Sequence, residues 1–206
     1  MGRQKFYLVF VAVCLLLTGC ALGEETEPDL VGAYQQVLRG NQTFMYNGEV
    51  CYLNEASAGL VEETPIFRQI AVADLDADGM PEVVISIDLE NFQDFGFIVL
   101  DWHDGTVNGY DFVLRALLRL KTDGTFSYSS GAADNGFGYA SFENGIAEII
   151  PIAYSETLFD GSVVGYVDGE AVTEDEFLDA ALIQEAKEDV QWFDFDGADL
   201  SVIFDQ

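Results

Sequence analysis

Residues 74–82 carry acidic side chains at the spacing of a calcium-binding loop. Three aspartates alternate with other residues, a glycine follows the third, and the ninth position is a glutamate (Asp74, Asp76, Asp78, Gly79 and Glu82). Calcium takes about six to eight oxygen ligands at about 2.3–2.6 Å, and acids at alternating positions of a tight loop bring their carboxylates to one point. Because glycine permits the sharp turn that such a loop needs, the segment predicts a calcium site.

The spacing differs from that of an EF-hand. The twelfth position, where an EF-hand has a bidentate glutamate, is Ile85, and we expect strands rather than helices on both sides of the loop. Met80 occupies the position at which such loops donate a backbone carbonyl. The pattern D-x-D-x-D-G-x-x-E between strands resembles the calcium loops of FG-GAP and VCBS-type extracellular modules. The resemblance implies that Glu82 completes the metal site.

Two other interpretations of the loop remain open. An acidic hairpin turn without an ion can arise by chance in a chain with 37 acidic residues, and a degenerate loop would keep its turn by Asx hydrogen bonds alone. Three aspartates in register, followed by the glycine and the ninth-position acid, favour the ion. Since extracellular modules bind calcium at about 10⁻⁴–10⁻³ M, we expect a structural Ca²⁺.

The first twenty residues, MGRQKFYLVFVAVCLLLTGC, have the features of a secretion leader. Arg3 and Lys5 precede an apolar run over residues 6–17, which is too short for a membrane-spanning helix of about 20 residues. The run ends in Leu-Thr-Gly-Cys, which resembles the lipobox of bacterial lipoproteins. The resemblance implies cleavage after residue 19 and acylation of Cys20. Two or more acyl chains anchor a protein stably, so we expect an extracytoplasmic protein held at the cell membrane.

The composition describes a folded and strongly acidic protein. The 206 residues include 37 Asp and Glu against 8 Lys and Arg, for a net charge of −29, while 50% are apolar and 13% aromatic. This apolar content predicts a packed core rather than disorder. Because phosphate backbones repel such a charge, nucleic-acid binding is excluded as a function class. We expect a monomer.

Hydrophobic periodicity and turn residues predict a single α+β domain over 28–206, after a lipoprotein signal peptide over 1–19 and a tether over 20–27. Pro28 suits the start of a helix over 28–39, and Asn-Gly and Asp-Gly pairs afterwards favour β-hairpins. The expected fold is an antiparallel β meander flanked by an N-terminal and a C-terminal helix. The expected strands are Phe67–Ala73, Glu82–Ile87, Phe97–Trp102, Leu117–Thr122, Thr125–Tyr128, Tyr139–Phe142, Ile146–Ala153 and Val163–Val167.

The C-terminal helix has the clearest local signal. Thr173 and Glu176 form the T-x-x-E pattern of a capping box, and apolar residues recur at helical spacing to about residue 190. The apolar runs Trp192-Phe193 and Leu200–Phe204 are expected to return to the sheet. The calcium loop and the Val172–Phe177 segment (V-T-x-x-E-F) together resemble a set of uncharacterised bacterial surface lipoproteins. The loop occurs once, so the propeller function of FG-GAP repeats does not transfer.

The other chemically active side chains give weaker signals. Cys51 is the one cysteine left after cleavage and acylation, and its apolar surroundings favour an inert buried thiol over a nucleophile. His103 is the single histidine and fits a hairpin turn better than a catalytic site. Zinc would need three or four His or Cys ligands, which the mature chain lacks.

The leading interpretation is a non-catalytic binding or cell-envelope accessory protein. The alternative is a surface hydrolase of glycan or peptide that uses two carboxylates, with candidates near Asp101, Asp104, Asp194 and Asp196. An inhibitor or regulator of another envelope protein is a third possibility. Alternating aromatic and small residues over 126–142 predict either one buried sheet face or exposed rings that contact a glycan or protein partner.

Overall fold

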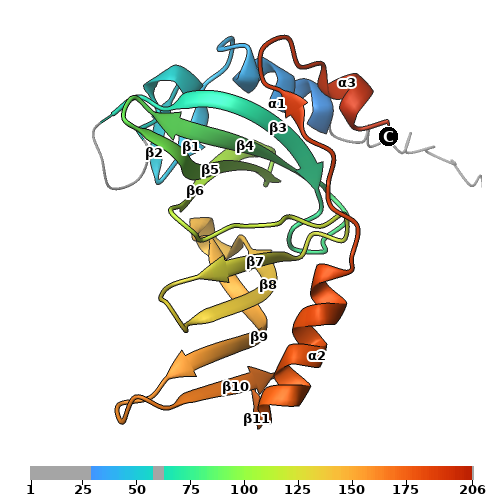
Figure 1. Ribbon diagram of the computed structural model, residues 1–206. Helices are drawn as coiled ribbons and strands as arrows, with labels where there is room; N and C mark the ends of the chain where they lie inside the picture. Colours follow the sequence, from blue (N-terminus) through green and yellow to red (C-terminus); the bar gives the residue numbers. More distant parts are fainter. Residues whose placement is uncertain (1–28, 58–62, 206) are drawn as a thin grey trace, which may run out of the picture.

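The computed structural model describes residues 29–57 and 63–205. The expected signal peptide over 1–19, Cys20 and the tether over 20–27 lie outside the described residues. The described chain forms two β-sheets with a few helices (Figure 1), so the predicted α+β class is confirmed. Within these residues, no helix is long and apolar enough to cross a membrane.

The larger sheet has seven strands in the order β12-β3-β4-β5-β6-β1-β2. Its centre, β3 to β6, is an antiparallel meander, β12 pairs with β3 at one edge, and β1 runs parallel to β6 near the other. The strands are β1 (Phe44–Tyr46), β2 (Glu49–Cys51), β3 (Ile66–Ala73), β4 (Glu82–Leu89), β5 (Phe92–His103), β6 (Thr106–Val113) and β12 (Phe193–Asp194).

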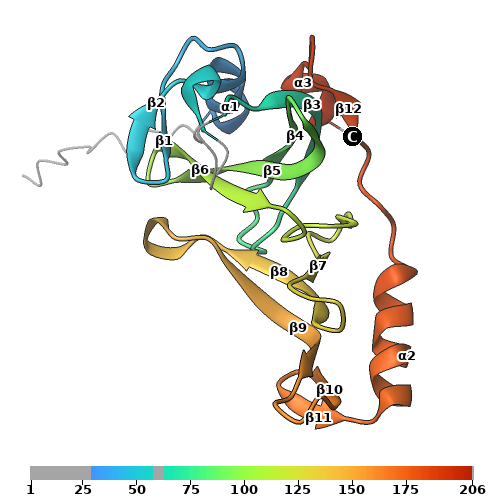
Figure 2. The same ribbon diagram turned by 60° about the vertical axis from the view of Figure 1, so that its left-hand side comes forward.

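The smaller sheet has five strands in the order β11-β10-β9-β8-β7. Helix α2 stands beside it and contacts β9 and β10 (Figure 2). The predicted capping box is confirmed, because Glu176 N–H donates to Thr173 Oγ1 and Thr173 N–H donates to the Glu176 carboxylate. The elements are β7 (Phe126–Ser129), β8 (Asn135–Ser141), β9 (Glu148–Thr157), β10 (Val163–Val167), β11 (Glu170–Val172) and α2 (Glu174–Glu185).

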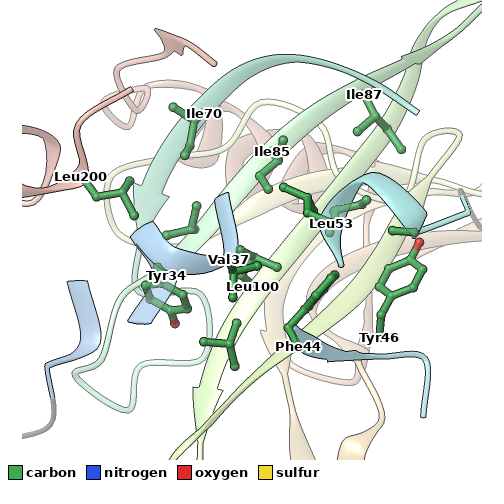
Figure 3. Close-up of a cluster of buried hydrophobic side chains, with 14 of the residues drawn as sticks. Tyr34, Val37, Phe44, Tyr46, Leu53, Ile70, Ile85, Ile87, Leu100 and Leu200 are labelled. Carbon is green, nitrogen blue, oxygen red and sulfur yellow. The ribbon is translucent and has the colours of Figure 1, made fainter. Parts of the chain in front are cut away.

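Two hydrophobic cores cover the two faces of the larger sheet. On one face, α1 (Leu30–Leu38) and α3 (Leu200–Ile203) pack on the strands, and Tyr34, Val37 and Leu200 lie against the sheet side chains (Figure 3). The opposite face packs against the smaller sheet and the segment that leads into it. Leu75, in the loop between β3 and β4, is fully buried in this second core. The predicted calcium loop is therefore fixed between the two sheets.

Several predicted hairpin turns are confirmed. Three Asx-Gly pairs have both residues at positive φ and join β1 to β2, β5 to β6 and β10 to β11, as two-residue hairpins require. These pairs are Asn47-Gly48, Asp104-Gly105 and Asp168-Gly169. The turn at Asp104-Gly105 places His103 at the end of β5, as the sequence predicted.

The strands that the sequence analysis missed include β6, where an Asx-Gly pair has a different role. Asn108-Gly109 lies inside this strand, and a Cβ on Gly109 would meet the Phe44 ring at 2.3 Å. Asn135-Gly136 likewise lies inside β8, where a Cβ on Gly136 would meet Tyr128 Oη at 2.5 Å. In both strands the glycine makes room for an aromatic side chain rather than forming a turn.

Three predictions for the fold need correction. The expected strand Leu117–Thr122 is irregular and makes only isolated bridges, because Arg119 has a φ of +49° that interrupts extended backbone. Residues 200–203 form α3 with Asp199 as the N-cap, although they were expected to join the sheet, which Phe193 does join. The single expected meander is two meanders in separate sheets. Two short 3₁₀-helices, η1 (Leu53–Glu55) and η2 (Glu143–Gly145), complete the fold.

Candidate metal centre

The loop between β3 and β4 brings the three predicted aspartates together. Asp74, Asp76 and Asp78 each place a carboxylate oxygen within 4.8 Å of the others. The same side chains hold the loop: Asp74 accepts from Gly79 N–H at 3.1 Å, Asp76 from Asp78 N–H at 3.1 Å, and Asp78 from Met80 N–H at 2.7 Å. Gly79 has a φ of +88°, which explains the glycine at this position.

Glu82, the ninth residue of the pattern, lies beneath the loop. It is the first residue of β4 and only 1% exposed. Its Oε2 accepts a hydrogen bond from Leu75 N–H at 2.6 Å, which joins the strand to the loop. Glu82 Oε1 and Asp74 Oδ1 are buried and have no hydrogen-bond partner among the described residues. Since leaving a buried carboxylate oxygen without a partner is costly, the site is suited to a cation.

A second buried carboxylate, Asp101, lies beside Glu82. Val83 pairs with Leu100, which places Glu82 and Asp101 opposite each other on β4 and β5. Asp101 is 3% exposed, and its Oδ2 also has no hydrogen-bond partner in the described part of the chain. The sequence analysis named Asp101 only as a candidate for hydrolysis. Its place beside the metal site depends on strand register, which the local pattern does not show.

The electrostatics of the cluster favour positive charge. Burial raises the pKa of Glu82 to about 9, and the charges of Asp76 and Asp101 add to the rise. Burial also raises the pKa of Asp101 to about 6 and, with the neighbouring aspartates, raises the pKa of Asp76. Without a cation, protons must neutralise part of the cluster, and a divalent ion would replace them.

The oxygen ligands fit a hard divalent cation. Carboxylates and backbone carbonyls suit calcium or magnesium, and a flexible set of several acids suits calcium better than the strict octahedron of magnesium. Asp74, Asp76 and Asp78 lie close enough together to bind such an ion, whereas Glu82 is outside this group of three and stays a predicted ligand. Met80 lies at the exit of the loop with its N–H bound to Asp78, and its carbonyl stays a predicted ligand.

Neighbouring segments hold the loop in place. The turn at residues 121–125 packs against Asp74, the first residue of the aspartate loop. The contact is so close that a Cβ on Gly124 would lie 1.8 Å from the Asp74 carbonyl oxygen. From the smaller sheet, Ala140 N–H donates to the Leu75 carbonyl at 2.9 Å. These contacts join the predicted ion site to both sheets.

A hollow of about 500 Å³ opens beside the loop. Asp76 and Asp78 line it together with residues of β8, η2 and β9. The remaining lining residues are His103, Tyr139, Ala140, Ser141, Phe142, Glu143 and Ile150. Tyr139 belongs to the aromatic segment over 126–142 and is 38% exposed, so one ring of that segment is exposed while Phe126 and Phe142 are buried.

The other candidate residues differ in their positions in the fold and in their exposure to solvent. Asp101 is buried, whereas Asp104 lies in the turn after β5 with its side chain 94% exposed, and Asp194 is on β12 at the sheet edge. His103 Nε2 lies 3.6 Å from Asp104 Oδ2 at the surface. Cys51 is half-buried, and burial with nearby Glu55 and Glu49 raises its thiol pKa. This disfavours a reactive thiolate, although the thiol is half-buried rather than buried as the sequence predicted.

A larger groove of about 1020 Å³ lies on the β3–β5 side of the sheet, away from the aspartate loop. Asp194, Phe97 and Trp192 line it, and the two rings pack with centroids 5.6 Å apart. Arg68 and Asp88 also line the groove and form an ion pair at 2.7 Å. Asp88 is therefore already paired with a cationic side chain.

Comparison with known proteins gives no relative for this chain. No family model, no curated protein and no solved structure matches it.

Proposed function

We propose that the loop over residues 74–82 binds one Ca²⁺ and that the ion stabilises the domain. The observation that carries the proposal is the Glu82 carboxylate, which is 1% exposed and has an unpartnered oxygen beneath three converging aspartates. A chance acidic turn has no reason to bury a fourth carboxylate under its loop. The hydrogen bonds within the loop also fit the degenerate interpretation, but they leave that buried oxygen without a partner.

Thermal unfolding in calcium and in chelator tests this proposal. At ten times its Kd, an ion that binds only the folded state adds about 1.4 kcal/mol, which raises the midpoint by about 3–6 °C for a chain of this size. Asp76→Asn should abolish the shift. Asp104→Asn is the matched control, because it removes the same charge from an exposed turn. An unchanged midpoint in 10 mM calcium would refute the proposal.

We further propose that the domain is a non-catalytic binding or envelope accessory module, anchored by lipid on Cys20 outside the cytoplasmic membrane. The leader sequence MGRQKFYLVFVAVCLLLTGC supports the anchor. The burial of Glu82 and Asp101 supports a structural role, since a substrate would not reach carboxyl groups that are 1% and 3% exposed. Cys20→Ala should move the protein from the membrane fraction to the soluble fraction. Unchanged membrane retention would contradict the anchor.

A further inference from the structure

The hollow beside the aspartate loop lies on the open side of the proposed ion. The inner side of the cluster is closed, because Asp74 Oδ1 and Glu82 Oε1 are buried. The outer side is formed by Asp76 and Asp78, which line the hollow. An ion held among these four carboxylates would therefore have one face toward the protein interior and one face toward the hollow.

The protein ligands do not fill the coordination sphere of calcium. Four carboxylates and the Met80 carbonyl supply five oxygens if each binds through one atom, whereas calcium takes about six to eight. The missing oxygens must come from the hollow, because the interior side is packed against Leu75 and β4. An oxygen-rich ligand could supply two of them at once.

The charge of the hollow selects against an anionic ligand. Asp76, Asp78 and Glu143 line it, and neither Lys nor Arg is among its lining residues. With Glu82 and Asp74 beneath, the site keeps a negative balance even after a divalent ion binds. A carboxylate or phosphate ligand would therefore be repelled, whereas neutral hydroxyl groups can bind calcium without adding charge.

The lining of the hollow also includes an apolar surface. Tyr139 on β8 pairs with Ile150 on β9, and both line the hollow. The Tyr139 ring is 38% exposed. Ser141 and His103 add hydrogen-bonding groups around it. A flat ligand with one apolar face and adjacent hydroxyl groups fits an aromatic ring on one side and a calcium ion on the other.

From this geometry we infer that the hollow binds a neutral sugar residue, with two adjacent hydroxyls on the calcium ion and its apolar face on Tyr139. The inference depends on the proposed calcium site. It gives the aromatic segment over 126–142 a role in ligand binding, and it makes recognition dependent on calcium.

The test is binding of the purified protein to an array of neutral oligosaccharides built from hexoses and N-acetylhexosamines, in 10 mM calcium and in chelator. We expect binding in calcium alone and at least a tenfold loss with Tyr139→Ala. Tyr52→Ala is the matched control, because Tyr52 is 40% exposed and does not line the hollow. Calcium-dependent thermal shifts should be equal in both variants, which shows that each is folded and loaded.

The outcomes separate the two proposals. A calcium-dependent thermal shift with no sugar bound overturns the sugar inference and leaves the ion site standing. No thermal shift overturns both. Binding that survives chelator or Tyr139→Ala also overturns the inference, because the ligand would then occupy another surface, such as the groove beside Trp192. Acidic oligosaccharides are added to the array for comparison, and stronger binding to them than to the neutral ones would contradict the charge argument.

Discussion

Replacing Glu82 by glutamine removes the buried ionisable group next to the aspartate loop and keeps the shape of the side chain. The glutamine carbonyl can still accept the hydrogen bond from Leu75 N–H. Its amide group adds a donor where Glu82 Oε1 has no partner. We expect Glu82→Gln to stabilise the calcium-free protein and to remove its response to calcium. A substitution at an ordinary buried ion pair would only destabilise.

The magnitude follows from the pKa of Glu82, which rises from 4.5 to about 9 on folding. A carboxyl group whose pKa is raised by folding stabilises the fold fully below its unfolded pKa and loses that contribution as pH rises through its folded pKa. At pH 7 the loss in the calcium-free protein is about 3 kcal/mol, from 1.4 kcal/mol per unit. Glu82→Gln should recover up to this amount, which corresponds to a midpoint about 6–12 °C higher.

The assay is chemical or thermal unfolding of both proteins in chelator between pH 5 and pH 8. The wild-type stability should fall with rising pH across this window, and the variant should show a smaller slope. In calcium at neutral pH, the wild type should become the more stable of the two proteins if the ion stabilises it by more than the Glu82→Gln substitution stabilises the variant. A destabilised calcium-free variant, or an unchanged pH slope, would refute the reasoning.

Three further predictions concern the loop and its support. Calcium binding should release about one proton from Glu82, whose pKa is about 9. The calcium affinity measured by titration calorimetry should therefore rise about tenfold per pH unit between pH 6 and pH 8. A calcium affinity that does not depend on pH would contradict this. Gly124→Ala should weaken calcium binding, because the added methyl group would displace Asp74. Gly105→Ala is the control: Gly105 has nearly the same φ (+78° against +79°) but no neighbour within 4 Å, so its calcium affinity should not change. Equal calcium affinities of the two variants would count against the contact. Lys121→Met should lower the free energy of unfolding, measured with denaturant, by about 3 kcal/mol. The reason is that Lys121 is 2% exposed and its ammonium group donates hydrogen bonds to two carbonyls and a carboxylate. A loss below about 1 kcal/mol would indicate that these bonds contribute little.

Local signals in the sequence identified most of the regular elements. The capping box at Thr173 and several Asx-Gly turns depend on backbone groups a few residues apart, so they are visible in the chain itself. The Asn108-Gly109 pair did not form the turn that such pairs favour, because Gly109 makes room for the ring of Phe44, which is distant in sequence. The irregular path near Arg119 leads into Lys121, whose ammonium group donates hydrogen bonds to carbonyls at the end of α2 and just after it. Long-range packing of this kind leaves no local pattern.

The sequence also identified the core of the candidate site. Asp74, Asp76 and Asp78 belong to one short loop, so their spacing alone predicts that they converge. The burial of Glu82 and its neighbour Asp101 depends on the pairing of β4 with β5, and the position of Tyr139 depends on the packing of two sheets. A single-sequence pattern does not specify either arrangement, although an acidic residue within a predicted strand, as at Asp101, is a local signal that points to it.

The most direct test of the calcium site is an anomalous difference map from a crystal of the protein grown or soaked in calcium. The proposed site predicts one peak between Asp74, Asp76, Asp78 and Glu82, with oxygen ligands at about 2.3–2.6 Å and both Glu82 Oε1 and the Met80 carbonyl turned toward it. A loop without a peak in millimolar calcium, or an ion bound elsewhere while Glu82 stays protonated beneath an empty loop, would contradict it.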